Sequence, residues 1–167
     1  IVSWNTLAQT QAGKSVLGTS ARITGSNLFM RLNYWVVYCG GEIMVNPPTL
    51  QGVEAPAEAI VNLTPTKFTF ELEKEPALPG NLKLIVQASA PQSNGISNAY
   101  SKASQIGNPL EPAIEEYDLK EVYDAKYGIP TTASPKVFIK YFFVNTATGE
   151  KSGDMMALAT LAEDAGE

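Results

Sequence analysis

The stretch that decides the fold is residues 136–145, which read Lys-Val-Phe-Ile-Lys-Tyr-Phe-Phe-Val-Asn. A strand with this sequence is largely apolar on both faces, which is typical of a central strand that is covered on both sides. The next residues, 146–150, predict a tight loop, and residues 155–161 then predict a partner strand. The last part of the chain therefore predicts an antiparallel strand pair.

The strand pattern continues toward the N-terminus. Apolar and polar side chains alternate over residues 67–74 and again over residues 81–89, as they do in strands with one buried face. Pro79-Gly80 lies between these two stretches and predicts a turn. We expect weaker strands at residues 58–63 and 100–106. Strands at this spacing, joined by hairpin turns, favour an antiparallel sandwich of two sheets.

One short helix is expected inside this strand pattern, over residues 118–127. Asp118, with Glu121 three residues later, predicts a capping box, in which two side chains satisfy the free N–H groups of the first turn. Gly128 and Pro130 predict the end of the helix.

The residues before the first strand follow a helical period instead. Residues 3–11 predict a short helix that begins at Ser3, and Gly13 and Gly18 predict the two ends of a loop.

Residues 26–39 predict the main helix of the chain, with Ser26 as its N-cap and Gly40-Gly41 as its stop. Its second half, Tyr34–Cys39, is apolar almost all round and is also compatible with a strand, because aromatic and β-branched residues dominate it. Pro47-Pro48 then predicts an extended linker.

These patterns predict two parts. Residues 1–50 are expected to form a helical N-terminal arm and linker, and residues 51–167 a β-sandwich domain. The expected fold class is mainly β with an α-helical N-terminal segment and one short inserted helix.

The composition narrows the class of protein. The chain has 167 residues, of which 44% are hydrophobic and 17% charged, and these fractions are typical of a globular domain rather than a disordered chain. It has no histidine and one cysteine, which removes the commonest general base, any intrachain disulfide and a thiolate zinc site. We therefore expect no enzyme and no cofactor. The longest apolar run, Tyr34–Cys39, is far shorter than the roughly 20 residues of a membrane span.

Charge is distributed unevenly along the chain. Residues 1–41 contain Lys14, Arg22, Arg31 and no acid, so they carry +3, whereas residues 42–167 hold 17 acids and 9 bases and carry −8. Three cations over this length are too dilute for nucleic acid, which is not expected as a partner. An acidic surface, such as that of a neighbouring copy, is the favoured partner of the first segment.

Two motifs admit chemical interpretations beside structural ones. Residues 8–15 match a relaxed phosphate-binding loop, but no apolar strand precedes them, so we interpret the match as coincidence. The acidic residues between 111 and 124 are interpreted as a solvated surface, with calcium binding or a catalytic carboxylate pair as alternatives. Tyr34, Trp35 and Tyr38 form either a packing surface or a platform for sugars or bases.

A longer pattern resembles a known group. It comprises Trp4, Ala8, Gly18, the run Ile23-Thr24-Gly25-Ser26-Asn27-Leu28-Phe29-Met30-Arg31-Leu32-Asn33, Gly40-Gly41 and Pro47-Pro48. It resembles a segment that precedes a β-rich domain in uncharacterised structural proteins of bacteriophages and prophages. Residues 86–95 and the hairpin around residues 145–152 are also similar to that group.

The resemblance implies a fibronectin type III or immunoglobulin-like sandwich and a structural role in a virion or related extracellular particle. The expected partners are other copies of the chain and other particle proteins, and the expected interface consists of Trp4, Leu28, Phe29, Arg31, Leu32 and Trp35. The alternative function is a carbohydrate-binding or adhesion module, with a glycan held by exposed aromatic residues such as Tyr100 or Tyr117.

Overall fold

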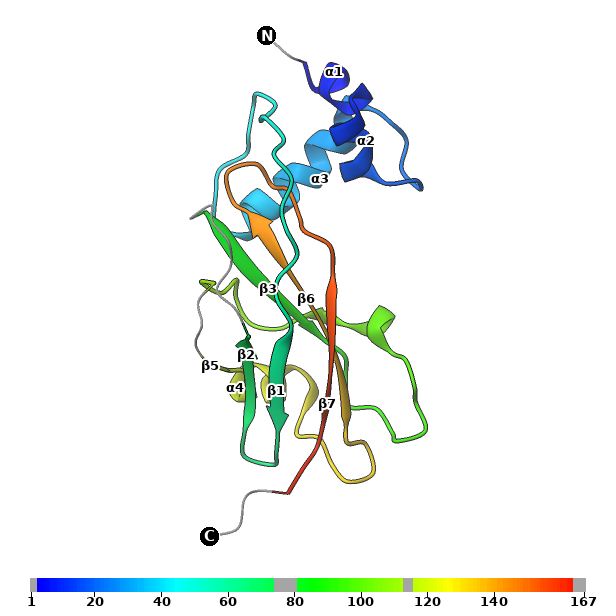
Figure 1. The fold of residues 1–167 in the computed structure, drawn as a ribbon, viewed down its shortest axis with the longest axis vertical. Helices are drawn as coiled ribbons and strands as arrows, with labels where there is room; N and C mark the ends of the chain where they lie inside the picture. The colour runs from blue at the N-terminus through cyan, green and yellow to red at the C-terminus, as the bar shows by residue number, and fades with distance from the viewer. Residues whose placement is uncertain (1–2, 74–80, 113–115, 164–167) are drawn as a thin grey trace. The chain divides into compact units, whose positions relative to one another are not determined.

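The described chain consists of two antiparallel sheets and four α-helices (Figure 1). This computed structural model describes residues 3–73, 81–112 and 116–163. The predicted turn at Pro79-Gly80 lies outside these residues.

The first sheet has the strand order β1-β2-β5. Strands β1 (Ala59–Leu63) and β2 (Phe68–Leu72) pair antiparallel and lie within the two predicted stretches, which confirms both predictions. Strand β5 (Glu116–Asp118) pairs with β2 and was not predicted, because a strand of three residues is too short to show a period.

The second sheet has the order β4-β3-β6-β7 and contains the long apolar strand. Strands β3 (Leu82–Ala88), β6 (Lys136–Asn145) and β7 (Met155–Thr160) confirm the predicted strands. Strand β7 pairs antiparallel with β6, so that Tyr141 lies opposite Met155. Strand β4 (Ser104–Gln105) has only two residues.

Aromatic rings from the two sheets share one core. The ring of Phe70 on β2 contacts the ring of Tyr141 on β6 edge to face, with 5.0 Å between the ring centres. Both side chains are fully buried. The alternation of β2 and the apolar character of β6 thus serve the same purpose, which is to fill the space between the sheets.

The prediction of a strand over residues 100–106 is largely wrong. A 3₁₀ turn, Tyr100–Lys102, takes its first half, and only the two residues of β4 are extended. The side chain of Asn98 accepts a hydrogen bond from the backbone N–H of Tyr100, which favours the turn over a strand.

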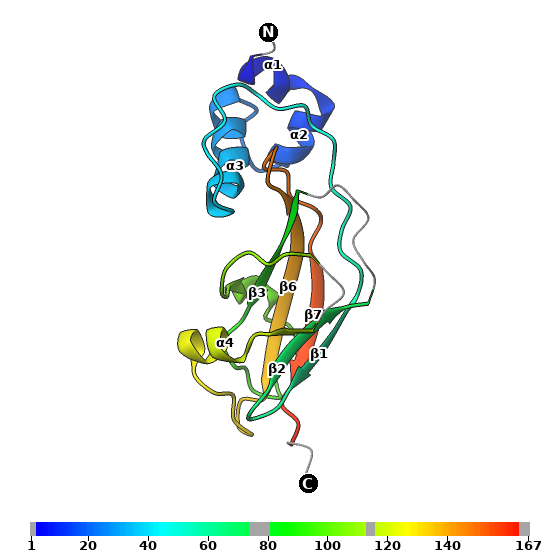
Figure 2. The ribbon, with the colours of Figure 1, turned by 90° about the vertical axis from the view of Figure 1, so that its left-hand side faces the viewer.

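Helix α4 (Lys120–Tyr127) confirms the inserted helix but corrects its first turn. Asp118 is the last residue of β5, and its side chain accepts from the backbone N–H of Lys120. The N-cap position is Leu119, so the predicted capping box does not form. Helix α4 lies beside β2 (Figure 2). Tyr123 of α4 packs on Phe68 of β2, with 5.1 Å between the ring centres.

The N-terminal residues form two short helices where one helix and a loop were predicted. Helix α1 spans Trp4–Gln9 and α2 spans Gln11–Leu17. Gly13 lies inside α2. An added Cβ at this position would lie 2.1 Å from the carbonyl oxygen of Leu7 in α1. This glycine therefore permits the close contact of α1 and α2. Because Gly13 is part of a helix, the prediction that it starts a loop was wrong.

Helix α3 (Gly25–Tyr38) confirms the main helix and decides against a strand in its second half. Its N-cap is Thr24, whose side chain accepts from the backbone N–H of Asn27, and not Ser26 as predicted. Gly40 follows the helix with a φ of 89°, as the predicted stop requires.

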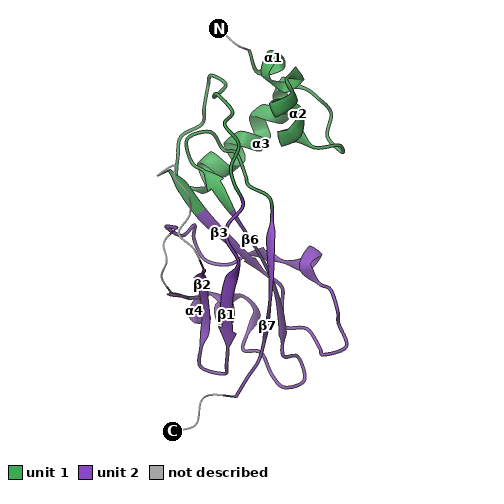
Figure 3. Ribbon diagram, in the orientation of Figure 1, with its two compact units in different colours: residues 1–54, 78–83, 143–153 green, residues 55–77, 84–142, 154–167 purple. Residues whose placement is uncertain are grey.

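Two compact units make up the chain (Figure 3). Unit 1 comprises residues 1–54, 78–83 and 143–153, and unit 2 comprises residues 55–77, 84–142 and 154–167. Unit 1 thus includes two segments that return late in the sequence. The predicted division near residue 50 stays a prediction.

The two units differ in charge. Unit 1 has five lysines or arginines and three acids, which gives +2, whereas unit 2 has seven and fourteen, which gives −7. Over the described ranges, no helix combines the length and the apolar character that a bilayer crossing demands.

Candidate functional site

Helix α3 holds most of the residues predicted for an interface, and the structure places them in different environments. Leu28 and Leu32 are fully buried and pack with Leu7, Ala8 and Leu17 in the core of unit 1. They fix α3 to the two preceding helices and offer no side-chain surface to a partner. This corrects the expectation for these two leucines.

Trp4 and Phe29 lie together on one flank of α3. Their rings meet edge to face with 5.2 Å between centres, and the indole N–H of Trp4 donates to the carbonyl oxygen of Val45 at 2.9 Å. Both side chains are half-buried and, with Met30, line a shallow pocket of about 400 Å³. This flank is a semi-rigid aromatic surface.

An apolar stripe of three residues runs along the solvent side of α3. Met30, Tyr34 and Val37 have exposed fractions of 68%, 55% and 48%. Residues spaced by four and three positions share one face of a helix, and this face is opposite the one that Leu28 and Leu32 bury. We call these three residues the α3 stripe. From the sequence, only Tyr34 of the three was considered for a surface role, because the exposure of Met30 and Val37 becomes visible only once the packed face of the helix is known.

The other flank of α3 borders a larger pocket, of about 680 Å³. Arg31, Tyr34 and Trp35 contribute from α3, and the remaining walls come from the end of α2 and from the hairpin loop after β6. Its complete lining is Ser15, Val16, Gly18, Arg31, Tyr34, Trp35, Gly149, Lys151, Ser152 and Gly153. Every one of these residues belongs to unit 1.

Gly149 holds the hairpin loop against α3. Its φ is 77°, and an added Cβ would lie 1.9 Å from the carbonyl oxygen of Leu32. Only glycine tolerates both this backbone conformation and this distance. The late hairpin and the early helix therefore form one wall of the pocket through a direct backbone approach.

Glu150, the next residue, ties the loop to the linker. Its carboxylate is buried and accepts from the backbone N–H groups of Gln51 and Gly52, at 2.9 and 2.8 Å, and from the hydroxyl of Thr148 at 2.9 Å. Three donors compensate the loss of water around the charge. Glu150 is thus a structural acid of unit 1.

Three aromatic rings of α3 pack on one another. Tyr34 contacts Trp35 edge to face at 4.9 Å and is stacked on Tyr38 at 6.1 Å. This network holds the rings that border the pocket in fixed orientations. Burial raises the pKa of the neighbouring Cys39 thiol, which disfavours its reactive thiolate form.

The other sequence candidates do not assemble into a chemical site. The phosphate-loop match, residues 8–15, spans the end of α1, Thr10 and α2, and no strand leads into it. In the acidic stretch, Asp124 pairs with Lys120 at 2.9 Å, and Glu115 lies outside the described residues. Among the residues that the structure describes, no group of three acids or cysteines could hold a metal ion.

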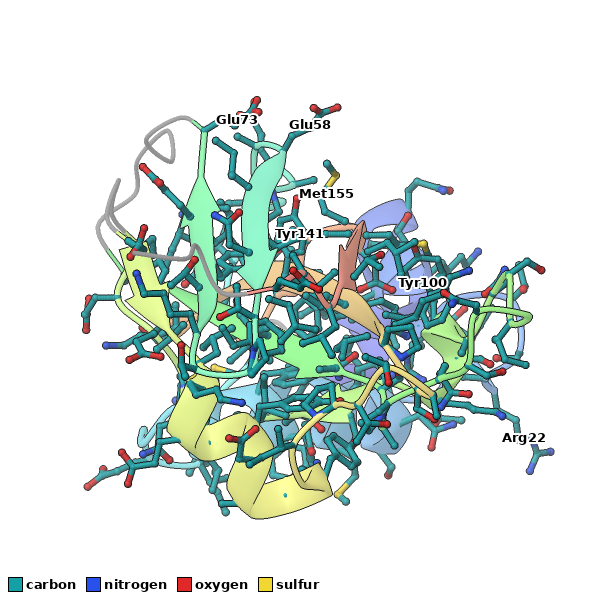
Figure 4. The ribbon with its side chains drawn as sticks, turned by 90° about the horizontal axis from the view of Figure 1, so that it is seen from below. Arg22, Glu58, Glu73, Tyr100, Tyr141 and Met155 are labelled. Carbon is teal, nitrogen blue, oxygen red and sulfur yellow. The ribbon has the colours of Figure 1, made fainter. Side chains whose placement is uncertain are left out.

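The two aromatic residues considered for glycan binding lie in unit 2. Tyr117 is 7% exposed and donates its hydroxyl to the carbonyl oxygen of Glu111, so it cannot serve as an exposed platform. Tyr100 is half-buried, with its ring edge to face against Phe138 at 5.0 Å (Figure 4).

The outer face of the three-stranded sheet is acidic. Glu71 of β2 lies directly opposite Glu116 of β5, and Glu58 and Glu73 project from neighbouring strand ends (Figure 4). Like charges opposite each other destabilise a sheet. The face therefore favours contact with cations.

No protein-family model matches the chain, and no curated protein matches its sequence.

Proposed function

We propose that the protein is a non-enzymatic structural protein of a virus or phage-like particle, and that it binds other copies of itself through the α3 stripe. The observation that carries this proposal is the exposure of Met30, Tyr34 and Val37 on one face of a helix whose opposite face is already packed. Grouped apolar side chains on a surface favour a contact that removes them from water.

The charges of the two units support a second copy of the chain as the partner that covers the α3 stripe. Unit 1 carries +2 and unit 2 carries −7, so unit 1 of one copy is complementary to unit 2 of another. Arg31 lies next to the stripe, and the acidic outer sheet face offers carboxylates. Contact between two different surfaces is heterologous, and it builds rings or filaments instead of a simple closed dimer.

The fold agrees with such a role. We infer an immunoglobulin or fibronectin type III kind of sandwich from its two antiparallel sheets of three and four strands and from the shared aromatic core between them. The proposed location is a virion or extracellular particle, with other particle proteins as further partners. The proposal assigns no catalytic residue and no cofactor.

The test is the native mass of the purified chain by light scattering across a concentration series. We expect a defined assembly above the 17.9 kDa of one chain, and we expect it to weaken as salt screens the complementary charges. Met30→Glu should reduce the mass toward that of one chain, because it places a charge in the apolar contact. A single-chain mass for the unmodified protein at high concentration would overturn the proposal.

Ile129→Glu is the matched control. Ile129 is 59% exposed, close to the value for Met30, but it lies in unit 2 after α4. Equal loss of assembly in both variants would contradict a specific role of α3. Circular dichroism of each variant checks that the fold is intact.

A further inference from the structure

The 680 Å³ pocket beside α3 has the size of a small-molecule site, and it shares Arg31 and Tyr34 with the surface proposed for self-association. Three separate elements build it: the end of α2, one flank of α3 and the hairpin loop after β6. The Gly149 approach to Leu32 fixes the distance between two of these elements. The fold itself therefore sets the separation of these two walls.

The charge of the side chains around the pocket is positive. Arg31 and Lys151 are cations, and none of the lining residues is an acid. Among the described residues Arg31 forms no ion pair. The hydroxyl of Ser152 already donates to the carbonyl oxygen of Gly153 and accepts from the backbone N–H of Phe143. A ligand that satisfies this wall must supply negative charge and acceptor atoms.

The aromatic wall adds an apolar requirement. Tyr34 and Trp35 border the pocket next to Arg31, and their mutual edge-to-face contact restrains both rings. Such surfaces bind the apolar face of a flat or ring-shaped group. The ligand therefore combines an anionic group with a ring.

The end of α2 selects between ring-shaped anions. Ser15, Val16 and Gly18 come from the last turn of this helix and its cap. The last carbonyl groups of a helix lack partners within the helix and carry partial negative charge. Carbonyl groups of this kind can accept hydrogen bonds from hydroxyl groups, and their partial negative charge suits a singly charged carboxylate better than a doubly charged phosphate. This favours a singly charged, hydroxyl-rich ring.

We propose that this pocket binds a carboxylated sugar, such as a hexuronic acid. The carboxylate pairs with the guanidinium of Arg31, the C–H face of the ring packs on Tyr34 and Trp35, and the hydroxyls donate toward the end of α2. The site lies entirely within unit 1 and does not require the self-association proposed above.

The experiment titrates the full chain with D-glucuronic acid and follows tryptophan fluorescence and heat. Both tryptophans of the chain belong to unit 1, and Trp35 lines the pocket. We expect saturable binding of glucuronic acid at millimolar concentrations or below and no binding of glucose, which has the same ring without the carboxylate. Arg31→Gln should weaken binding by roughly tenfold or more, because it removes a charge-assisted pair.

Arg22→Gln is the control for net charge, since Arg22 is an exposed cation outside the pocket. It should bind glucuronic acid as the unmodified chain does. Any of three results would overturn the proposal: equal binding of glucose, equal competition by inorganic phosphate, or unchanged binding in Arg31→Gln. Absence of glucuronic acid binding at millimolar concentrations would overturn it too. Light scattering on the same Arg31→Gln sample reports assembly separately.

Discussion

Aromatic side chains are used in opposite ways in the two units. In unit 2, rings pair inside the core, as Phe70 does with Tyr141 and Phe68 with Tyr123. In unit 1, Tyr34 and its ring neighbours pair at the surface of α3. In these pairs, the rings of unit 2 contribute to the stability of a core, whereas the rings on α3 in unit 1 remain available for contact with a partner.

The units are also held together differently. Unit 2 depends on side chains that fill the space between its two sheets, which is the usual source of stability where sheets pack face to face. In unit 1, the helices α1, α2 and α3 pack around a cluster of five buried residues, with partly buried side chains around it. Close backbone approaches at Gly13 and Gly149 and the buried carboxylate of Glu150 supplement it.

The largest effect is expected from Gly149→Ala, which should destabilise the fold of unit 1 and leave that of unit 2 intact. The new Cβ would overlap the carbonyl oxygen of Leu32 and would also strain a φ of 77°. We expect destabilisation of unit 1 by more than about 4 kcal/mol, among the largest single-residue effects. Tryptophan fluorescence should report the loss, because both tryptophans lie in unit 1.

Hydrogen exchange of the amides of residues 136–142 in β6 and of β7 then measures unit 2 in the same variant. Protection should persist, because the core between the sheets does not include Gly149. Simultaneous loss of both signals would show that the two units fold as one. Gly40→Ala is the control, since Gly40 has a φ of 89° but open space around it, and only the backbone cost of roughly 1–2 kcal/mol applies.

The sequence predicts the strands of unit 2 better than the surfaces of unit 1, and the reason is physical. A strand such as β6 records its burial directly in its own residues, because side chains alternate between two faces. The contact of Gly149 with Leu32 joins residues more than one hundred positions apart, and no local pattern contains it.

The candidate site shows the same limit. Arg31 and Trp35 were predicted as interface residues and do line the pocket, since both are unusual side chains beside an apolar run. The α3 stripe is visible only once the packed face of the helix is known. Leu28 and Leu32 were assigned to an interface because the sequence did not reveal that α1 and α2 cover them.

A medium effect is expected when unit 2 is exposed to alkaline pH. Burial, together with the nearby charges of Glu58 and Glu73, raises the pKa of Tyr141 to about 12, although a backbone hydrogen bond acts in the opposite direction. Because the pKa in the folded state is above its ordinary value of about 10, the protonated ring stabilises the fold fully below pH 10. This contribution, about 2–3 kcal/mol, is lost as the pH rises from about 10 to 12.

Chemical denaturation at a series of alkaline pH values, followed by exchange protection in β6, measures this loss. In Tyr141→Phe the fall in stability with pH should be smaller. Part of the fall should remain, because burial also raises the pKa of Tyr123. An unchanged pH dependence in Tyr141→Phe would contradict the assignment to this ring.

The smallest effect distinguishes two neighbouring residues at the start of α3. Thr24 accepts from the N–H of Asn27, so Thr24→Ala should destabilise unit 1 by about 1 kcal/mol. Ser26, the cap that the sequence predicted, lies inside the first turn, and Ser26→Ala should change stability by less than about 0.5 kcal/mol. Denaturation followed by tryptophan fluorescence measures both values in unit 1.

A larger effect of Ser26→Ala than of Thr24→Ala would place the cap at Ser26 and shift the start of the helix by two residues. Such a shift would leave the spacing of Met30, Tyr34 and Val37 unchanged, because all three would still lie within the helix. The exposed stripe therefore depends on the packing of the helix and not on which residue caps it.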